Sequence, residues 1–240
     1  GWTTEGELGP ESLPGSLRDE LRRRLDRLPP QALRLALAFS VLGSTVQLEL
    51  VRRLSGLSRV ESMKGLQTLH DEKLTKMVAE ASKPGVHTFV NSSSREILYE
   101  RIPEDGRKAL HELAARLSLE LYGEDDEEEL PGIARHFLEA ERREEGIRYG
   151  LRAAKRLVRR LELEEARGLY TKIMEVNAAE DPLLDVQVRY ERALLLRRMG
   201  SFQQAREIVE GLLETRVPGG HRPTPTMLHL EAAKDCLTLG

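Results

Sequence analysis

The sequence contains few of the residues that build disulfides, thiolate metal sites or aromatic cores. A single cysteine, Cys236, excludes an internal disulfide and a cysteine-based zinc site. Aromatic residues make up 4% of the chain, and their scarcity disfavours a β-sandwich or barrel, whose strands are rich in aromatic and β-branched residues. Leucine, alanine, arginine and glutamate dominate instead, a mixture that favours helices.

The chain also lacks a strong excess of charge and a long apolar run. A net charge of −3 over 240 residues gives no overall electrostatic reason to bind nucleic acid or an anionic membrane. No apolar run approaches the roughly 20 residues of a membrane-spanning helix, and residues 1–16 lack the charged-then-apolar order of a signal peptide. We therefore expect a cytoplasmic protein without membrane contact, in which residues 1–15 form a linker.

Motifs of catalysis and cofactor binding are missing as well. The phosphate-binding pattern G-x-x-x-x-G-K-[ST] does not occur, and no G-x-S-x-G elbow surrounds the serines at 92–94. The six histidines show neither H-E-x-x-H nor His-x-His spacing, although His111 and His136 fall in separate predicted helices that could pack together. The sequence thus predicts no enzyme activity, catalytic residue, cofactor or metal, and the spacing of Ser93 and Glu96 favours a helix cap.

Residues 16–102 change from helical to strand-like periodicity. A helix with a stripe of leucines is predicted over 16–29. Three short helical patterns follow: one opens at Pro30 and is apolar on most sides, one covers 46–56, and one opens with the capping-box pair Ser58 and Glu61. Two alternating runs, 74–80 and 86–91, then flank a turn cluster and predict a β-hairpin. Three helices followed by a hairpin is the order of a winged-helix domain.

A pattern of small and apolar residues recurs in the second half of the chain. It consists of Gly200, Phe202, Ala205, Val209 and Leu212, and it matches Leu161, Leu163, Ala166, Tyr170 and Ile173, 39 residues earlier. Recurring helix pairs at such a period predict a helical solenoid over 142–240. We expect a left-handed glycine at the corner, an alanine at the helix crossing and Phe202 in the seam between helix pairs.

Two further expectations concern the segments around this repeat. Residues 103–141 are expected to be connecting helices that include a solvated acidic loop, Glu124–Glu129, with a cation or a basic partner as the other reading of that loop. The chain stops after the first helix of a third pair, 223–240, which suggests a fragment of a longer protein that ends within the solenoid.

Several segments resemble known families. The stretch "ALLLRRMGSFQQAREIVEGLLE" resembles tetratricopeptide repeats, whose usual period is about 34 residues. The stretches "LPGSLRDELRRRLDRLPPQALRLALAFSVLG", "HTFVNSSSREILYERIPEDGRKALHELAARL" and "IARHFLEAERREEGIRYGLRAAKRL" resemble the region after the nucleotide-binding core in signal-transduction ATPases with numerous domains. That resemblance covers about Leu13–Met174, although relatives usually carry histidine at the position of Asn91. It implies a winged-helix arm followed by a tetratricopeptide-like sensor, with the ATPase core upstream.

A candidate binding surface follows from the repeat. First helices line the concave groove of such stacks, and alignment on Ala166 and Ala205 selects the residues that face it. These are Arg148, Leu151, Lys155, Arg159, Gln187, Tyr190, Leu194 and Arg197. Arginine forks suit carboxylates or phosphates, and a tyrosine offers a flat amphipathic anchor. The hypothesis is a groove for a protein or an acidic peptide; the alternative is that these arginines only solvate an outer face.

The sequence predicts a mainly α protein that acts as a regulatory protein–protein interaction module of a larger signalling ATPase or kinase-linked protein. The upstream ATPase or kinase domain would be a second partner. The alternative function is a DNA-binding winged-helix transcriptional regulator. It is less favoured because the expected recognition helix, near 58–73, carries about equal numbers of basic and acidic residues, whereas phosphate contacts require a net positive helix.

Overall fold

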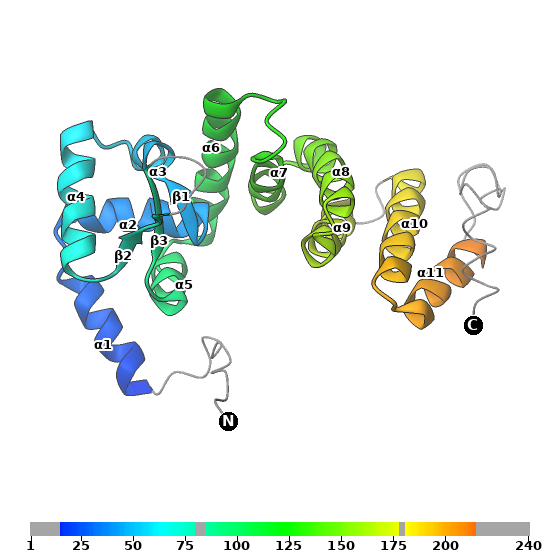
Figure 1. Ribbon diagram of the computed structural model, residues 1–240, viewed down its shortest axis with the longest axis horizontal. Coiled ribbons are helices and arrows are strands. Elements are labelled where there is room, and N and C mark those ends of the chain that lie inside the picture. The colour runs from blue at the N-terminus through cyan, green and yellow to red at the C-terminus, as the bar shows by residue number, and fades with distance from the viewer. Residues whose placement is uncertain (1–14, 80–84, 178–180, 215–240) are drawn as a thin grey trace. The chain divides into compact units, whose positions relative to one another are not determined.

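The computed structural model describes residues 15–79, 85–177 and 181–214, and the chain divides between Leu121 and Tyr122 into two compact units. Both units are helical, and the first also contains a small sheet (Figure 1). Within the described ranges, no helix is both long and apolar enough to cross a lipid bilayer. The expected linker, the third helix pair and Cys236 lie outside the described residues, apart from Gly15 at the start of the first helix.

Within its described residues, the first unit holds six helices and three short strands. The helices are α1 (Gly15–Asp26), α2 (Pro30–Leu42), α3 (Leu48–Ser55), α4 (Arg59–Asp71), α5 (Ser92–Glu100) and α6 (Glu104–Tyr122). The strands are β1 (Thr45–Gln47), β2 (Thr75–Met77) and β3 (Val86–Phe89). Helix α2 is buried on most sides, as its apolar sequence predicts, and it packs against α3, α4 and α5.

The sheet of this unit has the order β1-β3-β2 and is antiparallel throughout. The predicted hairpin is confirmed, since Thr75 of β2 pairs with Phe89 of β3. Strand β1 is a correction, because the sequence predicts that the helix over 46–56 begins at Val46, whereas Thr45–Gln47 pairs with β3 and α3 begins at Leu48. Three residues are too few to show an alternating pattern.

The sequence predicts two helix caps, of which the structure confirms one and corrects the other. At α4 the capping box is confirmed: Ser58 accepts from the Glu61 amide at 3.3 Å, and Glu61 accepts from the Ser58 amide at 2.9 Å. At α5 the expected cap is wrong, since Asn91, not Ser93, caps the helix. The Asn91 side chain accepts from the Ser93 amide at 2.8 Å. Asparagine is among the strongest N-cap residues, so Ser93 becomes a buried residue of the first turn.

In the residues that the structure describes, the second unit is a succession of five helices. They are α7 (Leu130–Glu139), α8 (Arg143–Arg159), α9 (Leu163–Asn177), α10 (Pro182–Arg198) and α11 (Phe202–Glu214). Each helix packs against its neighbours along the chain, and α7 also touches α9. The sequence places α6 and α7 together as connecting helices, whereas the division of the structure puts α6 in the first unit and α7 in the second.

The same corner recurs three times in this unit. Glu141, Leu161 and Gly200 all have a left-handed backbone, with φ of 54°, 64° and 80°. In each corner the next amide donates to a carbonyl five residues earlier, which is the Schellman arrangement that ends a helix. The bonds are Arg142 to Phe137 at 2.9 Å, Glu162 to Leu157 at 3.0 Å and Ser201 to Leu196 at 2.9 Å. The match between Leu161 and Gly200 is thus confirmed in the backbone, but glycine is not required.

Small residues lie where the helices of the second unit cross, and the sequence repeat predicts only some of them. Ala166 and Ala205 are buried as expected, but Phe202 is 52% exposed and does not fill the seam. Two glycines of α8 allow the closest approaches. A Cβ atom at Gly150 would lie 2.9 Å from Ile173 Cδ1 of α9, and one at Gly146 would lie 2.9 Å from Leu138 Cδ2 of α7. Helix α8 therefore packs closely on both neighbours.

Candidate functional site

A basic groove lies on the second unit, between residues of α7, α8, α9 and α10. Its cavity volume is about 490 Å³. We use the name basic groove for the cavity lined by Glu127, Leu130, Arg152, Lys155, Arg156, Val158, Arg159, Tyr170, Glu191 and Arg198. Five of these side chains are basic and two are acidic, although the whole chain is slightly acidic. The groove therefore concentrates positive charge that the composition does not show.

Arg156 is the buried cation of this groove. Its side chain is only 7% exposed, and its one ion pair among the described residues joins Nε to Glu127 Oε2 at 3.7 Å. That separation is longer than a hydrogen bond. A buried charge is unfavourable unless it is paired and hydrogen-bonded. Arg156 consequently retains the capacity to bind a further anionic group that enters the groove.

Lys155 and Arg198 are the groove cations that form no ion pair among the described residues. Both are exposed, and neither forms an ion pair or a hydrogen bond with any residue in the described ranges. The other two exposed cations are engaged: Arg159 Nη2 lies 3.5 Å from Glu127 Oε1, and Arg152 donates to the Glu124 carbonyl at 3.1 Å. Lys155 and Arg198 can therefore receive an anionic ligand without first losing a partner.

Tyr170 supplies a neutral polar group to the groove. The residue is 1% exposed, and burial, followed by the charge of Glu191, raises its pKa well above the usual value, while Arg198 partly opposes this shift. A tyrosine hydroxyl is protonated at physiological pH, and the raised pKa of Tyr170 extends the protonated state to higher pH. The groove thus offers cationic groups and one hydroxyl, a set that suits carboxylates or phosphates.

We expect Tyr170 to be among the last tyrosines to ionise. Folding stabilises the protonated phenol, so this contribution to stability is complete below the ordinary pKa and is lost as pH rises through the raised value. The absorbance of tyrosinate during an alkaline titration measures the transition. Tyr170→Phe should remove a transition from the high-pH end, and an unchanged high-pH end would contradict the assignment.

The structure brings two of the eight predicted groove residues into the basic groove, Lys155 and Arg159. Tyr190 is a correction: it is 6% exposed and belongs to a hydrophobic cluster between α10 and α11, against which Leu194 also packs. The remaining predicted residues lie outside the groove lining: Arg148, Gln187, Arg197 and Leu151, of which the first two are exposed and the last two are half-buried.

The misplacement on α10 has a simple geometric cause. The sequence alignment selects Tyr190 and Arg197, whereas the structure places their next neighbours, Glu191 and Arg198, in the groove. One residue rotates a position by about 100° around a helix. On α10 the predicted positions therefore differ from the groove lining by one residue, whereas on α8 the prediction shares Lys155 and Arg159 with the lining and omits Arg152 and Arg156. That these residues bind a partner stays a prediction.

The histidines do not form a metal centre within the part of the chain that the structure describes. Groups of three or more His, Cys, Asp or Glu side chains with suitable geometry do not occur there. The His111 ring nitrogen lies 2.8 Å from the Tyr99 hydroxyl, and His136 is buried in α7. His70 and His87 lie with ring centroids 5.2 Å apart. Burial, together with His70, lowers the pKa of His87.

Helix α4, the expected recognition helix, presents a mixed surface. Val60 and Met63 are 64% and 53% exposed. Arg59 and Lys64 are balanced by Glu61 and by Asp71 on the same helix. Exposed apolar side chains and balanced charge are less suited to a DNA phosphate backbone than a net basic helix.

Comparisons with protein-family models, with curated proteins and with solved structures found no match to this chain.

Proposed function

We propose that the second unit is a tetratricopeptide-like repeat module that holds an acidic segment of a partner protein in the basic groove. Sequential packing of the helices, the 39-residue spacing and the left-handed corners support a repeat architecture. The observation that carries the binding function is the groove chemistry. It combines a buried arginine, two exposed cations without ion pairs among the described residues, and a protonated tyrosine.

We also propose that the first unit is a winged-helix arm, and that the whole chain belongs to a regulatory, signal-transduction ATPase of the kind its sequence resembles. The sheet order β1-β3-β2, which joins a hairpin to a short strand ahead of α3, supports this proposal. The regulatory role is what this resemblance implies, and the basic groove would contribute the binding of a partner. A cytoplasmic location and an upstream ATPase or kinase domain remain predictions of the sequence.

A binding assay with two peptides and a DNA duplex tests the function. The probe is a fluorescein-labelled peptide, EDDEEE, with the uncharged peptide QNNQQQ as a control and a random-sequence DNA duplex as the alternative ligand. We expect the acidic peptide to bind saturably and to weaken as salt rises, because exposed ion pairs are screened. The uncharged peptide should not bind.

Two results would count against the proposal. Equal binding of the charged and uncharged peptides would exclude recognition of charge. Absence of peptide binding at about 50 mM salt, together with DNA binding that falls steeply towards about 200 mM, would favour the DNA-binding alternative.

A further inference from the structure

The acidic loop Glu124–Glu129 lies against the basic groove instead of extending into solvent. Glu124 accepts a hydrogen bond from the Tyr149 hydroxyl at 2.6 Å, and its Oε1 lies 3.6 Å from Arg148 Nη2. The Glu127 carboxylate lies 3.7 Å from Arg156 and 3.5 Å from Arg159. The expectation of a solvated loop is therefore incomplete, since its carboxylates are exposed but ion-paired.

The pairing partners form a row along one helix. Arg148, Arg152, Arg156 and Arg159 are spaced four, four and three residues apart, which places them on one face over about three turns of α8. The loop follows this row in order: Glu124 contacts Arg148 and Arg152 at one end, and Glu127 contacts Arg156 and Arg159 at the other. The row thus already binds a run of carboxylates.

We infer that the loop is a resident pseudoligand of the basic groove, and that a partner binds by replacing it. This inference rests on the proposed function. Glu127 lines the groove itself and approaches Arg156, the buried cation. An incoming acidic segment that uses Arg156 and Arg159 must therefore displace the Glu127 carboxylate. The partner matches the loop in chemistry: it is an acidic, extended protein segment.

The loop is held in a manner that permits this exchange. Its carboxylates are exposed, with Glu127 at 65% and Asp125 fully accessible, and ion pairs of exposed groups are individually weak. A tether of a few residues nevertheless gives the loop an effective concentration of about millimolar at the groove. The loop excludes ligands with few charges, whereas an acidic segment displaces it by also binding Lys155 and Arg198, which the loop leaves unpaired among the described residues.

Neutralising the loop tests this inference. The variant E124Q/D125N/E127Q keeps the shape of the side chains and removes the charges that compete with the ligand. We expect the labelled EDDEEE peptide to bind this variant about tenfold more tightly than the wild-type chain. A matched control, E164Q/E175Q/E207Q, removes the same charge from exposed positions of α9 and α11 outside the basic groove, and it should leave the affinity within about twofold of wild type.

The outcomes separate the two proposals. Equal, measurable affinity for wild type, loop variant and control would overturn the pseudoligand and leave the groove function standing. Binding by none of the three would overturn both. A second measurement follows the loop itself in the wild-type chain: Asp126 accepts from the Glu128 and Glu129 amides at 2.9 and 3.3 Å. Hydrogen exchange of these two amides should accelerate when the peptide binds, and unchanged exchange would contradict displacement.

Discussion

Replacing Lys155 and Arg198 with glutamate is expected to weaken binding of the EDDEEE peptide by about ten- to a hundredfold. These two side chains form no ion pair within the described part of the chain, so the reversal removes attraction to the ligand without breaking an internal contact. It also replaces attraction with repulsion at two points of the groove. Fluorescence anisotropy of the labelled peptide at low salt measures the change.

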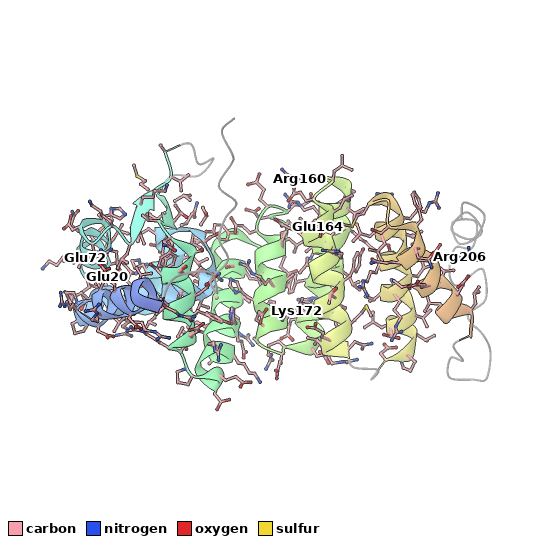
Figure 2. All side chains as sticks on the ribbon, turned by 90° about the horizontal axis from the view of Figure 1, so that it is seen from below. Glu20, Glu72, Arg160, Glu164, Lys172 and Arg206 are labelled. Atoms are coloured by element: carbon pink, nitrogen blue, oxygen red, sulfur yellow. The ribbon has the colours of Figure 1, made fainter. Side chains whose placement is uncertain are left out.

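The matched control reverses two cations outside the groove, Arg160 and Arg206 (Figure 2), which are 55% and 43% exposed. The net charge changes equally in both variants. If the groove is the site, R160E/R206E should retain an affinity within about threefold of wild type. Equal losses in the two variants would show that the peptide responds only to overall charge, and the groove would then not be the site.

Replacing Tyr149 with alanine is expected to destabilise the second unit by about 3–5 kcal/mol, the range for truncating a large buried aromatic residue. Tyr149 is fully buried, its ring stacks on Phe137 with centroids 5.4 Å apart, and its hydroxyl donates to Glu124. Alanine removes both the packing between α7 and α8 and the anchor of the acidic loop. Because the chain has two units, its unfolding is not described by one free energy. Native-state hydrogen exchange of α7, α8 and α9 measures the local free energy of unfolding of the second unit instead.

Tyr149→Phe separates the two contributions. Phenylalanine keeps the ring stacked on Phe137 and removes only the two hydrogen bonds of the hydroxyl, the one donated to Glu124 and the one accepted from Arg148 at 2.7 Å. We therefore expect a loss of about 1–2 kcal/mol. The affinity for the acidic peptide should rise at the same time, because the loop loses an anchor. If the phenylalanine variant were as unstable as the alanine variant, the packing explanation would be wrong.

The parts of the fold that the sequence predicts are those with strong local patterns. The apolar run of α2, the alternating strands β2 and β3 and the Ser58–Glu61 cap each follow from residues close together in the chain. The corner at Gly200 is similar, because a small residue between two helical patterns is a local signal.

The parts that the sequence misses depend on contacts between distant residues. Strand β1 forms because Thr45–Gln47 pairs with one edge of β3. Tyr190 is buried by α11, and a difference of one residue on α10 separates the core from the groove. No pattern within the acidic loop predicts that it pairs with α8, because the arginines lie farther along the chain. The signal that could have found the pairing is the combination of the acidic run with a later row of arginines spaced by three and four residues.

The most direct test of the basic groove is chemical-shift mapping of the isotope-labelled chain during titration with the EDDEEE peptide. The account predicts that the largest amide shifts lie at 124–129, at 152–159 in α8 and at 191–198 in α10. Shifts concentrated on α4 and the β2–β3 hairpin, or spread evenly over both units, would contradict it.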